Sequence, residues 1–188
     1  MAPTLADRAR RRWKEHARYS AHQANTSDPI SRISYCAGLP SVQPQRESIT
    51  AIAPIMQCLA ARADSFLSAE QIRSDPEHYA RNAIHIAPSG NFSLFALVWR
   101  PGQWTPVHDH GSWGVVGIVR GVLEERSYMS ASGDITADSD ISLKRGGVIL
   151  LNPGSISSFV PNPDHIYMTG VPEERETCIS LHLYVRIR

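Results

Sequence analysis

The sequence predicts a mainly β protein, an antiparallel sandwich or barrel preceded by a helical extension. From residue 80 onward, short runs rich in Val, Ile, Leu and Phe are separated by Gly, Pro, Asn and Asp, as in strands joined by tight turns. No helical period lies between these runs, which argues against an alternating strand–helix fold. Before residue 80 the apolar residues recur at helical spacing instead.

Helices are predicted in three stretches of the first 80 residues, at 5–23, 47–67 and 68–79. In the second stretch, apolar residues recur every three or four positions from Ile49 to Leu59. The third opens on Ser68, a residue type that caps helix N-termini. Residues 24–45 are rich in Pro, Ser and Asn, so they are predicted to form a loop.

The strands are expected in the second part of the chain, and we predict one domain overall, with a helical extension over residues 1–80 packing on a β-barrel over residues 81–188. The predicted strands cover residues 82–87, 92–99, 113–119, 122–129, 147–152, 156–160, 165–171 and 178–187.

The composition excludes several classes of protein. With 188 residues, 42% hydrophobic and 20% charged residues and a formal charge of +1, the chain has no overall attraction to nucleic acid or anionic membranes. The basic cluster at residues 8–14 is interpreted as the solvated face of a helix. Neither an apolar run that could span a bilayer nor a signal peptide is present, so a cytoplasmic location is expected. The three cysteines form no CxxC pair, which predicts neither disulfides nor a thiolate zinc site.

His108 and His110 are the first candidate metal ligands. On a strand, residues two apart point to the same face, so both imidazoles would project into the barrel. Imidazole is a ligand for iron, zinc, copper and nickel. Gly102, six residues before His108, and Gly121, eleven after His110, frame the pair.

This arrangement resembles the first motif of the cupins, and residues 77–186 resemble thiol dioxygenases of the cysteine dioxygenase type. The resemblance implies a cupin-type double-stranded β-helix, a jelly-roll barrel, holding Fe(II). Positions 114 and 115 hold Gly and Val, so the glutamate ligand of oxalate-type cupins is absent. Animal-type enzymes link a cysteine near position 114 to an active-site tyrosine, and Gly114 predicts that this crosslink is absent.

Two further segments extend the resemblance. "HYARNAI" resembles the segment whose arginine binds the substrate carboxylate, which implies that role for Arg81, with Tyr79 as a weaker candidate for substrate binding. "SLHLY" resembles the catalytic Ser-His-Tyr triad, which maps onto Ser180, His182 and Tyr184. Their period of two places all three on one strand face.

The third metal ligand has two candidates. The family places a histidine fifteen residues before the triad histidine, and this count leads to Tyr167. His165 lies two residues earlier and has the same strand parity. Register favours Tyr167, whereas Fe(II) chemistry favours a neutral imidazole over a phenol with an ordinary pKa of about 10. Both candidates stay open at this stage.

The resemblance implies an iron-dependent oxidoreductase that oxidises the sulfur of L-cysteine or a similar thiol with O2 to a sulfinate. Relatives that act on mercaptopropionate carry their arginine well beyond the triad tyrosine, where this sequence ends, so an α-amino thiol acid is expected. One alternative is a diverged cupin of a natural-product pathway giving a sulfonamide or decarboxylated product. Another is a non-redox metal cupin, an isomerase or binding module. The expected partners are a small thiol and O2, with no nucleic acid or membrane, and the oligomeric state is left open.

Overall fold

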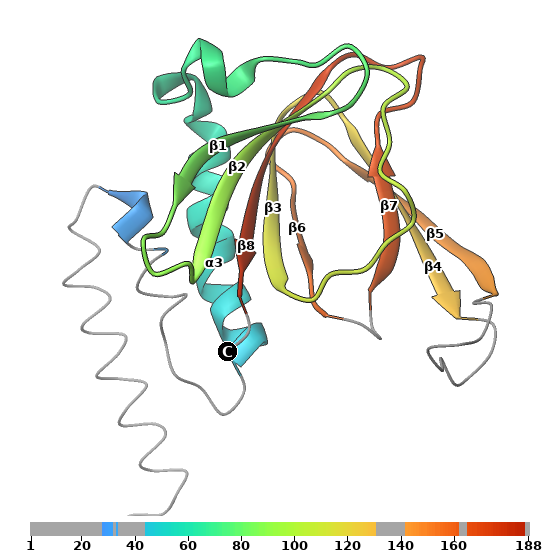
Figure 1. Ribbon diagram of the computed structural model, residues 1–188, viewed down its shortest axis with the longest axis horizontal. Coiled ribbons are helices and arrows are strands. Elements are labelled where there is room, and N and C mark those ends of the chain that lie inside the picture. The colour runs from blue at the N-terminus through green and yellow to red at the C-terminus, as the bar shows by residue number, and fades with distance from the viewer. Residues whose placement is uncertain (1–27, 32, 34–43, 131–141, 162–164, 187–188) are drawn as a thin grey trace, which may run out of the picture.

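The computed structural model describes residues 28–31, 33, 44–130, 142–161 and 165–186 (Figure 1). Each predicted strand is present, with ends shifted by a few residues. The strands are β1 (Ala80–Ile86), β2 (Phe92–Trp99), β3 (Trp113–Arg120), β4 (Leu123–Ser130), β5 (Leu143–Leu151), β6 (Ile156–Phe159), β7 (Ile166–Gly170) and β8 (Cys178–Val185).

The strands form two antiparallel sheets that face each other (Figure 1). The larger sheet has the order β1-β2-β8-β3-β6, and the smaller has the order β5-β4-β7. Two isolated bridges, between Trp104 and Gly170 and between His108 and Tyr167, hold the segment before β3 alongside β7. This segment therefore continues the smaller sheet, and the interior lies between the two sheets.

Helix α3 (Pro44–Ala61) packs on the outer face of the larger sheet (Figure 1). Ile52 and Met56 of the helix are fully buried and share a core with Leu94, Leu181 and Leu183 of the sheet. Burying each such side chain contributes about 1.5–3 kcal/mol. The apolar residues whose spacing predicted this helix therefore form the face that packs on the sheet.

A second core fills the space between the sheets. It combines Leu97 and Val116 of the larger sheet with Leu123 and Leu151 of the smaller one. Because neighbouring residues on a strand point to opposite faces, each strand of the larger sheet supplies one set of side chains to α3 and the other set to the interior. The candidate site lies on this inner side.

The predictions for the N-terminal part were partly wrong. The stretch 68–79 forms only the short 3-10 helix η2 (Ala69–Ile72), although Ser68 does cap it, as part of a capping box with Gln71. The backbone is already extended at Arg73, and Pro76, three residues further on, cannot continue a helix. Another 3-10 helix, η1 (Ala63–Ser65), follows α3.

The predicted loop at 24–45 also contains helix. Residues 29–31 and 33 are helical, because Asp28 accepts hydrogen bonds from the backbone N–H groups of Ile30 and Ser31, both at 3.1 Å, and Pro29 occupies the first helical position. The helix predicted at 5–23 and the basic cluster at 8–14 lie outside the described residues.

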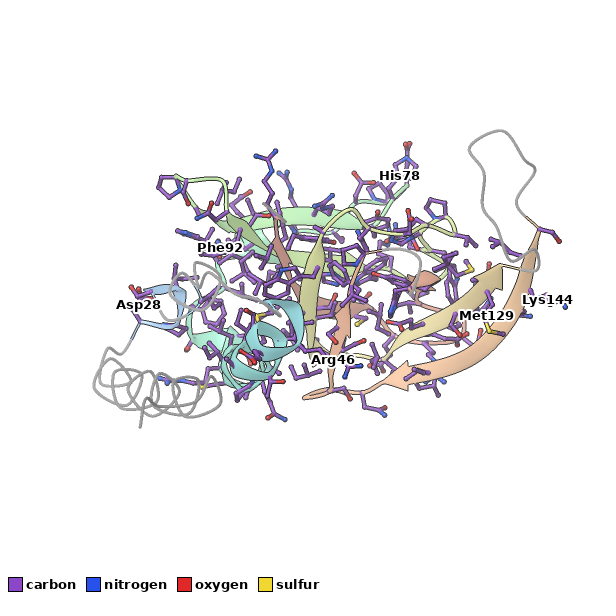
Figure 2. All side chains as sticks on the ribbon, turned by 90° about the horizontal axis from the view of Figure 1, so that it is seen from below. Asp28, Arg46, His78, Phe92, Met129 and Lys144 are labelled. Carbon is purple, nitrogen blue, oxygen red and sulfur yellow. The ribbon has the colours of Figure 1, made fainter. Side chains whose placement is uncertain are left out.

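The longest hairpin, β4–β5, extends away from α3, and the labelled Met129 and Lys144 mark its outer end (Figure 2). Within the described residues, no helix has both the length and the apolar character needed to cross a membrane.

Candidate metal centre and substrate pocket

His108 and His110 lie in an irregular segment before β3, not inside a regular strand as predicted. Gly102 and Gly121, the glycines that frame the motif, have φ of 81° and 72°, a backbone region that favours glycine. The two imidazoles nevertheless converge, with their Nε2 atoms 3.2 Å apart. The loop therefore brings together the pair that the spacing predicted.

Tyr167 of β7 completes the cluster. Its backbone N–H donates to the carbonyl oxygen of His108 at 3.0 Å, and its carbonyl accepts from the N–H of His108 at 2.9 Å. This pairing places the two residues directly opposite each other, so their side chains share a face. The Tyr167 hydroxyl lies 2.9 Å from Nε2 of His110.

The orientation of the His108 ring follows from its backbone contact. Its Nδ1 lies 2.9 Å from the carbonyl oxygen of Pro106, which can only accept, so Nδ1 donates here and Nε2 is the nitrogen that faces His110. Carbonyl groups orient metal-ligating histidines in this way. The Nε2 atoms of His108 and His110 therefore face each other, with the Tyr167 hydroxyl beside Nε2 of His110.

The donor set fits a metal ion. Donors at right angles on one metal, each bonded at about 2.1 Å, are about 3.0 Å apart, and here the two donor separations are 3.2 and 2.9 Å. Burial, reinforced by the neighbouring His108, lowers the pKa of His110 from 6.5 to about 4, so this imidazole is neutral, the form that binds metals. Among the described residues no cluster of three or more His, Cys, Asp or Glu side chains suits a metal, because the third partner is a tyrosine.

His165, the other candidate for the third metal ligand, faces Glu125. Its Nε2 lies 3.6 Å from a carboxylate oxygen of Glu125, and its ring stands perpendicular to that of Tyr167 with centroids 4.5 Å apart. The structure therefore brings Tyr167, and not His165, to the histidine pair.

Arg81 is exposed and lies on β1, the edge strand of the larger sheet. Its guanidinium carbon is 4.7 Å from the ring centroid of Phe95 and 5.2 Å from that of Tyr184. Within the described part of the chain it pairs with no carboxylate, so its fork is available to an anion. Tyr79, the weaker candidate for substrate binding, stacks on Trp99 with the ring centroids 4.4 Å apart.

Ser180, His182 and Tyr184 lie on the inner face of β8, the side opposite Leu181 and Leu183. Ser180 Oγ is 2.9 Å from Nε2 of His182. Tyr184 does not form a hydrogen bond with His182 among the described contacts, since the two rings lie nearly parallel with centroids 6.1 Å apart. The hydrogen bonds therefore join Ser180 to His182 but do not extend to Tyr184 among the described contacts.

Trp99 is the partner that the sequence analysis missed. Its indole N–H donates to Ser180 Oγ at 2.9 Å, so the hydrogen-bonded series runs from Trp99 through Ser180 to His182. Burial, followed by the charge of Arg81, lowers the pKa of His182 from 6.5 to about 3. Burial also raises the pKa of the Tyr184 hydroxyl. Both groups are therefore neutral inside the folded protein.

Phe159 of β6 is a second residue that the sequence did not single out. Its ring lies 4.2 Å from that of His110 and 5.5 Å from that of Tyr184. A Cβ atom on Gly114 would overlap this ring and the carbonyl oxygen of Leu183. The space that a crosslinking cysteine would need is therefore filled by Phe159.

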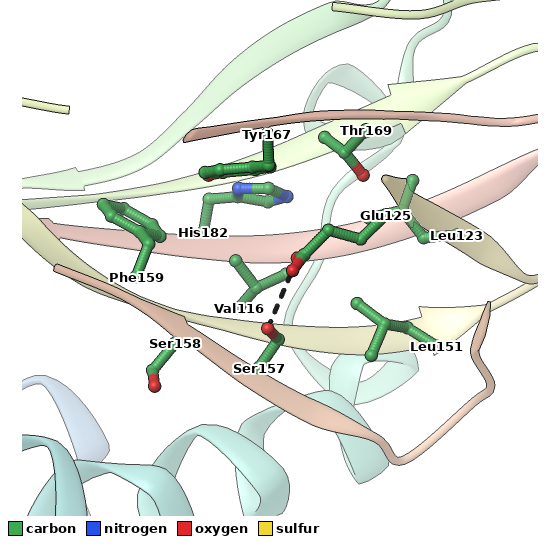
Figure 3. Close-up of a pocket in the computed structure, with 10 residues that line it drawn as sticks. All are labelled: Val116, Leu123, Glu125, Leu151, Ser157, Ser158, Phe159, Tyr167, Thr169 and His182. Atoms are coloured by element: carbon green, nitrogen blue, oxygen red, sulfur yellow. Dashed lines mark hydrogen bonds between the residues drawn. The ribbon is translucent and has the colours of Figure 1, made fainter. Parts of the chain in front are cut away.

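A small cavity continues behind the cluster, between the two sheets (Figure 3). Most of its walls are apolar, but the carboxylate of Glu125 points into it toward Ser157. The signal for this residue was the adjacent acidic pair Glu124 and Glu125 in a predicted strand, because alternation turns one of the two inward. The complete lining is Val116, Leu123, Glu125, Leu151, Ser157, Ser158, Phe159, Tyr167, Thr169 and His182.

Two facing antiparallel sheets with an inward cluster of imidazoles define a cupin-type double-stranded β-helix. The family model for cysteine dioxygenase type I matches residues 42–186, and the chain belongs to this family. Its members are generally metal-dependent. The match begins earlier than the resemblance found in the sequence, because it includes α3.

Solved structures similar to this chain include the TT1209 protein of Thermus thermophilus, with 18% identity over 62% of this chain and 90% of the other, at a TM-score of 0.44. A Klebsiella pneumoniae protein with a double-stranded β-helix domain is 16% identical over 64% and 87% of the two chains, also at 0.44. A cupin-like protein of Thermotoga maritima is 12% identical over 64% and 81%, at the same TM-score.

Proposed function

We propose that this protein is a non-haem Fe(II)-dependent dioxygenase that oxidises the sulfur of L-cysteine, or of a cysteine-like thiol, to a sulfinate. The observation that carries the proposal is that Nε2 of His110 lies within 3.2 Å of both His108 Nε2 and the Tyr167 hydroxyl, near an arginine that has no carboxylate partner in the described chain. Membership of the cysteine dioxygenase family supports the same reaction class. A cytoplasmic location belongs to this proposal.

His108, His110 and Tyr167 would hold the iron, and the remaining coordination positions would accept the substrate thiolate and O2. The metal supplies the redox chemistry that joins the two. Overall, one thiol and one O2 give one sulfinic acid: both oxygen atoms are bonded to sulfur, which loses four electrons to O2. No other reductant is needed.

Arg81 would bind the substrate carboxylate. A guanidinium matches a carboxylate with two parallel hydrogen bonds, and the rings of Phe95 and Tyr184 hold this one from one side. This contact would fix the substrate at one end while its thiol faces the metal. Specificity for an amino-acid thiol over a simple thiol would follow.

Tyr184 would donate a hydrogen bond in the pocket, since burial keeps its hydroxyl protonated. Its ring packs against Phe95 and Phe159, and the Arg81 guanidinium lies over it. Behind it, the series of Trp99, Ser180 and His182 closes the inner wall with satisfied polar groups, which keeps bulk water away from the reacting sulfur.

A diverged cysteine oxidation is the second candidate, and Tyr167 favours it. An anionic phenolate ligand would lower the reduction potential of iron relative to a third imidazole and could redirect the reaction toward a sulfonamide or decarboxylated product. A third candidate is a non-redox cupin, which would work with Zn(II) or Ni(II) and consume no oxygen.

One experiment separates these candidates. The iron-loaded protein is incubated with L-cysteine and isotopically labelled O2, oxygen uptake is followed, and products are identified by mass spectrometry. We expect cysteine sulfinate carrying two labelled oxygen atoms. A different labelled product would establish the diverged reaction, and turnover without oxygen uptake would contradict both oxygenase proposals.

A further inference from the structure

Glu125 is a carboxylate inside the barrel, on β4 behind the cluster of His108, His110 and Tyr167. Its exposed fraction is 8%, and burying a carboxylate is costly unless it is paired and hydrogen-bonded. Figure 3 shows the carboxylate turned toward Ser157, whose hydroxyl donates to it at 3.4 Å. The proposed chemistry at the metal does not use this residue.

The other carboxylate oxygen of Glu125 engages His165. The distance to His165 Nε2 is 3.6 Å. Without their backbone atoms, the side chains of Glu125 and His165 are 11% and 23% exposed. His165 is also the residue that competes with Tyr167 for the third donor position, because it lies two residues away on the same side. Nε2 of His165 therefore faces Glu125, and binding a metal through this nitrogen would require the ring to turn.

The contacts of Tyr167 differ from those of His165. Backbone pairing with His108 fixes its position, and its hydroxyl meets His110 at 2.9 Å. The perpendicular ring of His165 packs against it with centroids 4.5 Å apart. Moving His165 to the histidine pair would break the contact with Glu125 and displace the tyrosine ring.

We infer that Glu125 is a positioning residue that selects Tyr167 over His165 as the third metal donor, by holding the His165 ring away from His108 and His110. The inference takes from the proposed function only the presence of iron at this pair, and not the substrate. It gives a role to a buried carboxylate that the proposed chemistry does not use.

Visible absorption spectroscopy identifies the third metal ligand. A phenolate bound to ferric iron absorbs visible light through charge transfer from the ligand, whereas three imidazoles give no such band. The full-length protein is loaded with Fe(II), oxidised to Fe(III), and its visible spectrum and iron content are recorded. We expect the band in the wild type and its loss in Tyr167→Phe; a wild type without the band would overturn the inference.

Glu125→Gln removes the charge with little change of shape. We expect the band per bound iron to fall at least about threefold, as His165 gains access to the metal, and to return in Glu125→Gln combined with His165→Ala. An unchanged band in the single variant, or no recovery in the double variant, would overturn the inference. The recovery separates selection of a ligand from general damage to the barrel.

Glu124→Gln is the matched control, because this neighbour pairs with Arg126 at 2.7 Å and does not line the cavity. It should leave the band unchanged. If Glu125→Gln does not fold, Glu125→Asp withdraws the charge by one methylene group, and a full band in that variant would overturn the inference. Failure of the proposed function would look different: the band would be present, but iron-loaded wild type would make no sulfinate.

Discussion

The pH dependence of folding stability tests the burial of His182. Its side chain lies on the inner face of β8 with an exposed fraction of 4%, and burial and Arg81 lower its pKa from 6.5 to about 3. Between these two pKa values, the unfolded chain binds a proton that the folded protein does not. Protonation therefore stabilises the unfolded state, and the free energy of unfolding falls as the pH decreases below 6.5, down to about 3.

The magnitude follows from the distance between the working pH and the unfolded pKa. At about pH 5 the solution is about 1.5 units below the unfolded pKa, and each unit contributes about 1.4 kcal/mol. His182 alone should therefore lower the free energy of unfolding by about 2 kcal/mol between about pH 7.5 and about pH 5. This is a large part of the stability of a typical domain.

Urea unfolding at both pH values measures this difference in the free energy of unfolding. A chelator is present so that metal release does not contribute. The control is His182→Gln, which keeps a polar side chain but does not titrate, so the remaining histidines and carboxylates contribute equally to both proteins. The pH-induced loss should be about 2 kcal/mol smaller in the variant than in the wild type. Equal losses would refute the argument.

Three further predictions concern the metal, the substrate and the packing. His110→Ala should weaken iron binding by at least about 100-fold, measured as iron per protein after desalting; stoichiometric iron would contradict the ligand assignment. Arg81→Ala should lower kcat/KM for L-cysteine roughly 10- to 100-fold but leave cysteamine, which has no carboxylate, nearly unaffected; equal losses would mean that Arg81 does not bind that group. Gly114→Ala should lower the free energy of unfolding by about 2 kcal/mol through overpacking, partly restored by Phe159→Leu in the same chain. Wild-type stability in Gly114→Ala would contradict the overlap with the Phe159 ring and the Leu183 carbonyl oxygen.

The fold was largely predictable because its signals are local. The alternation and turn residues that define β2 and β3 place their predicted and observed ends within one residue of each other. The helical period from Ile49 to Leu59 likewise predicted α3. The short η2 was overestimated, since the apolar period is weak there and proline at position 76 interrupts it.

The parts of the site were predictable where sequence spacing determines the direction of the side chains. They were not predictable where the position of a residue depends on pairing between strands. The period of two placed Ser180, His182 and Tyr184 on one face. By contrast, the choice between His165 and Tyr167 depends on the register against His108, a contact between segments far apart in sequence that no local pattern encodes. The role of Trp99 as a partner of Ser180 depends in the same way on the pairing of β2 with β8.

The two-sided use of β8 has a consequence for how this region can vary in length. Leu181 and Leu183 face the helix, whereas Ser180, His182 and Tyr184 face the pocket, so inserting or deleting one residue within the strand would exchange the apolar and the polar sets. Such a change would bury polar groups under α3 and line the pocket with leucine. Length changes inside this strand should therefore be far less tolerable than length changes in the segments that flank it.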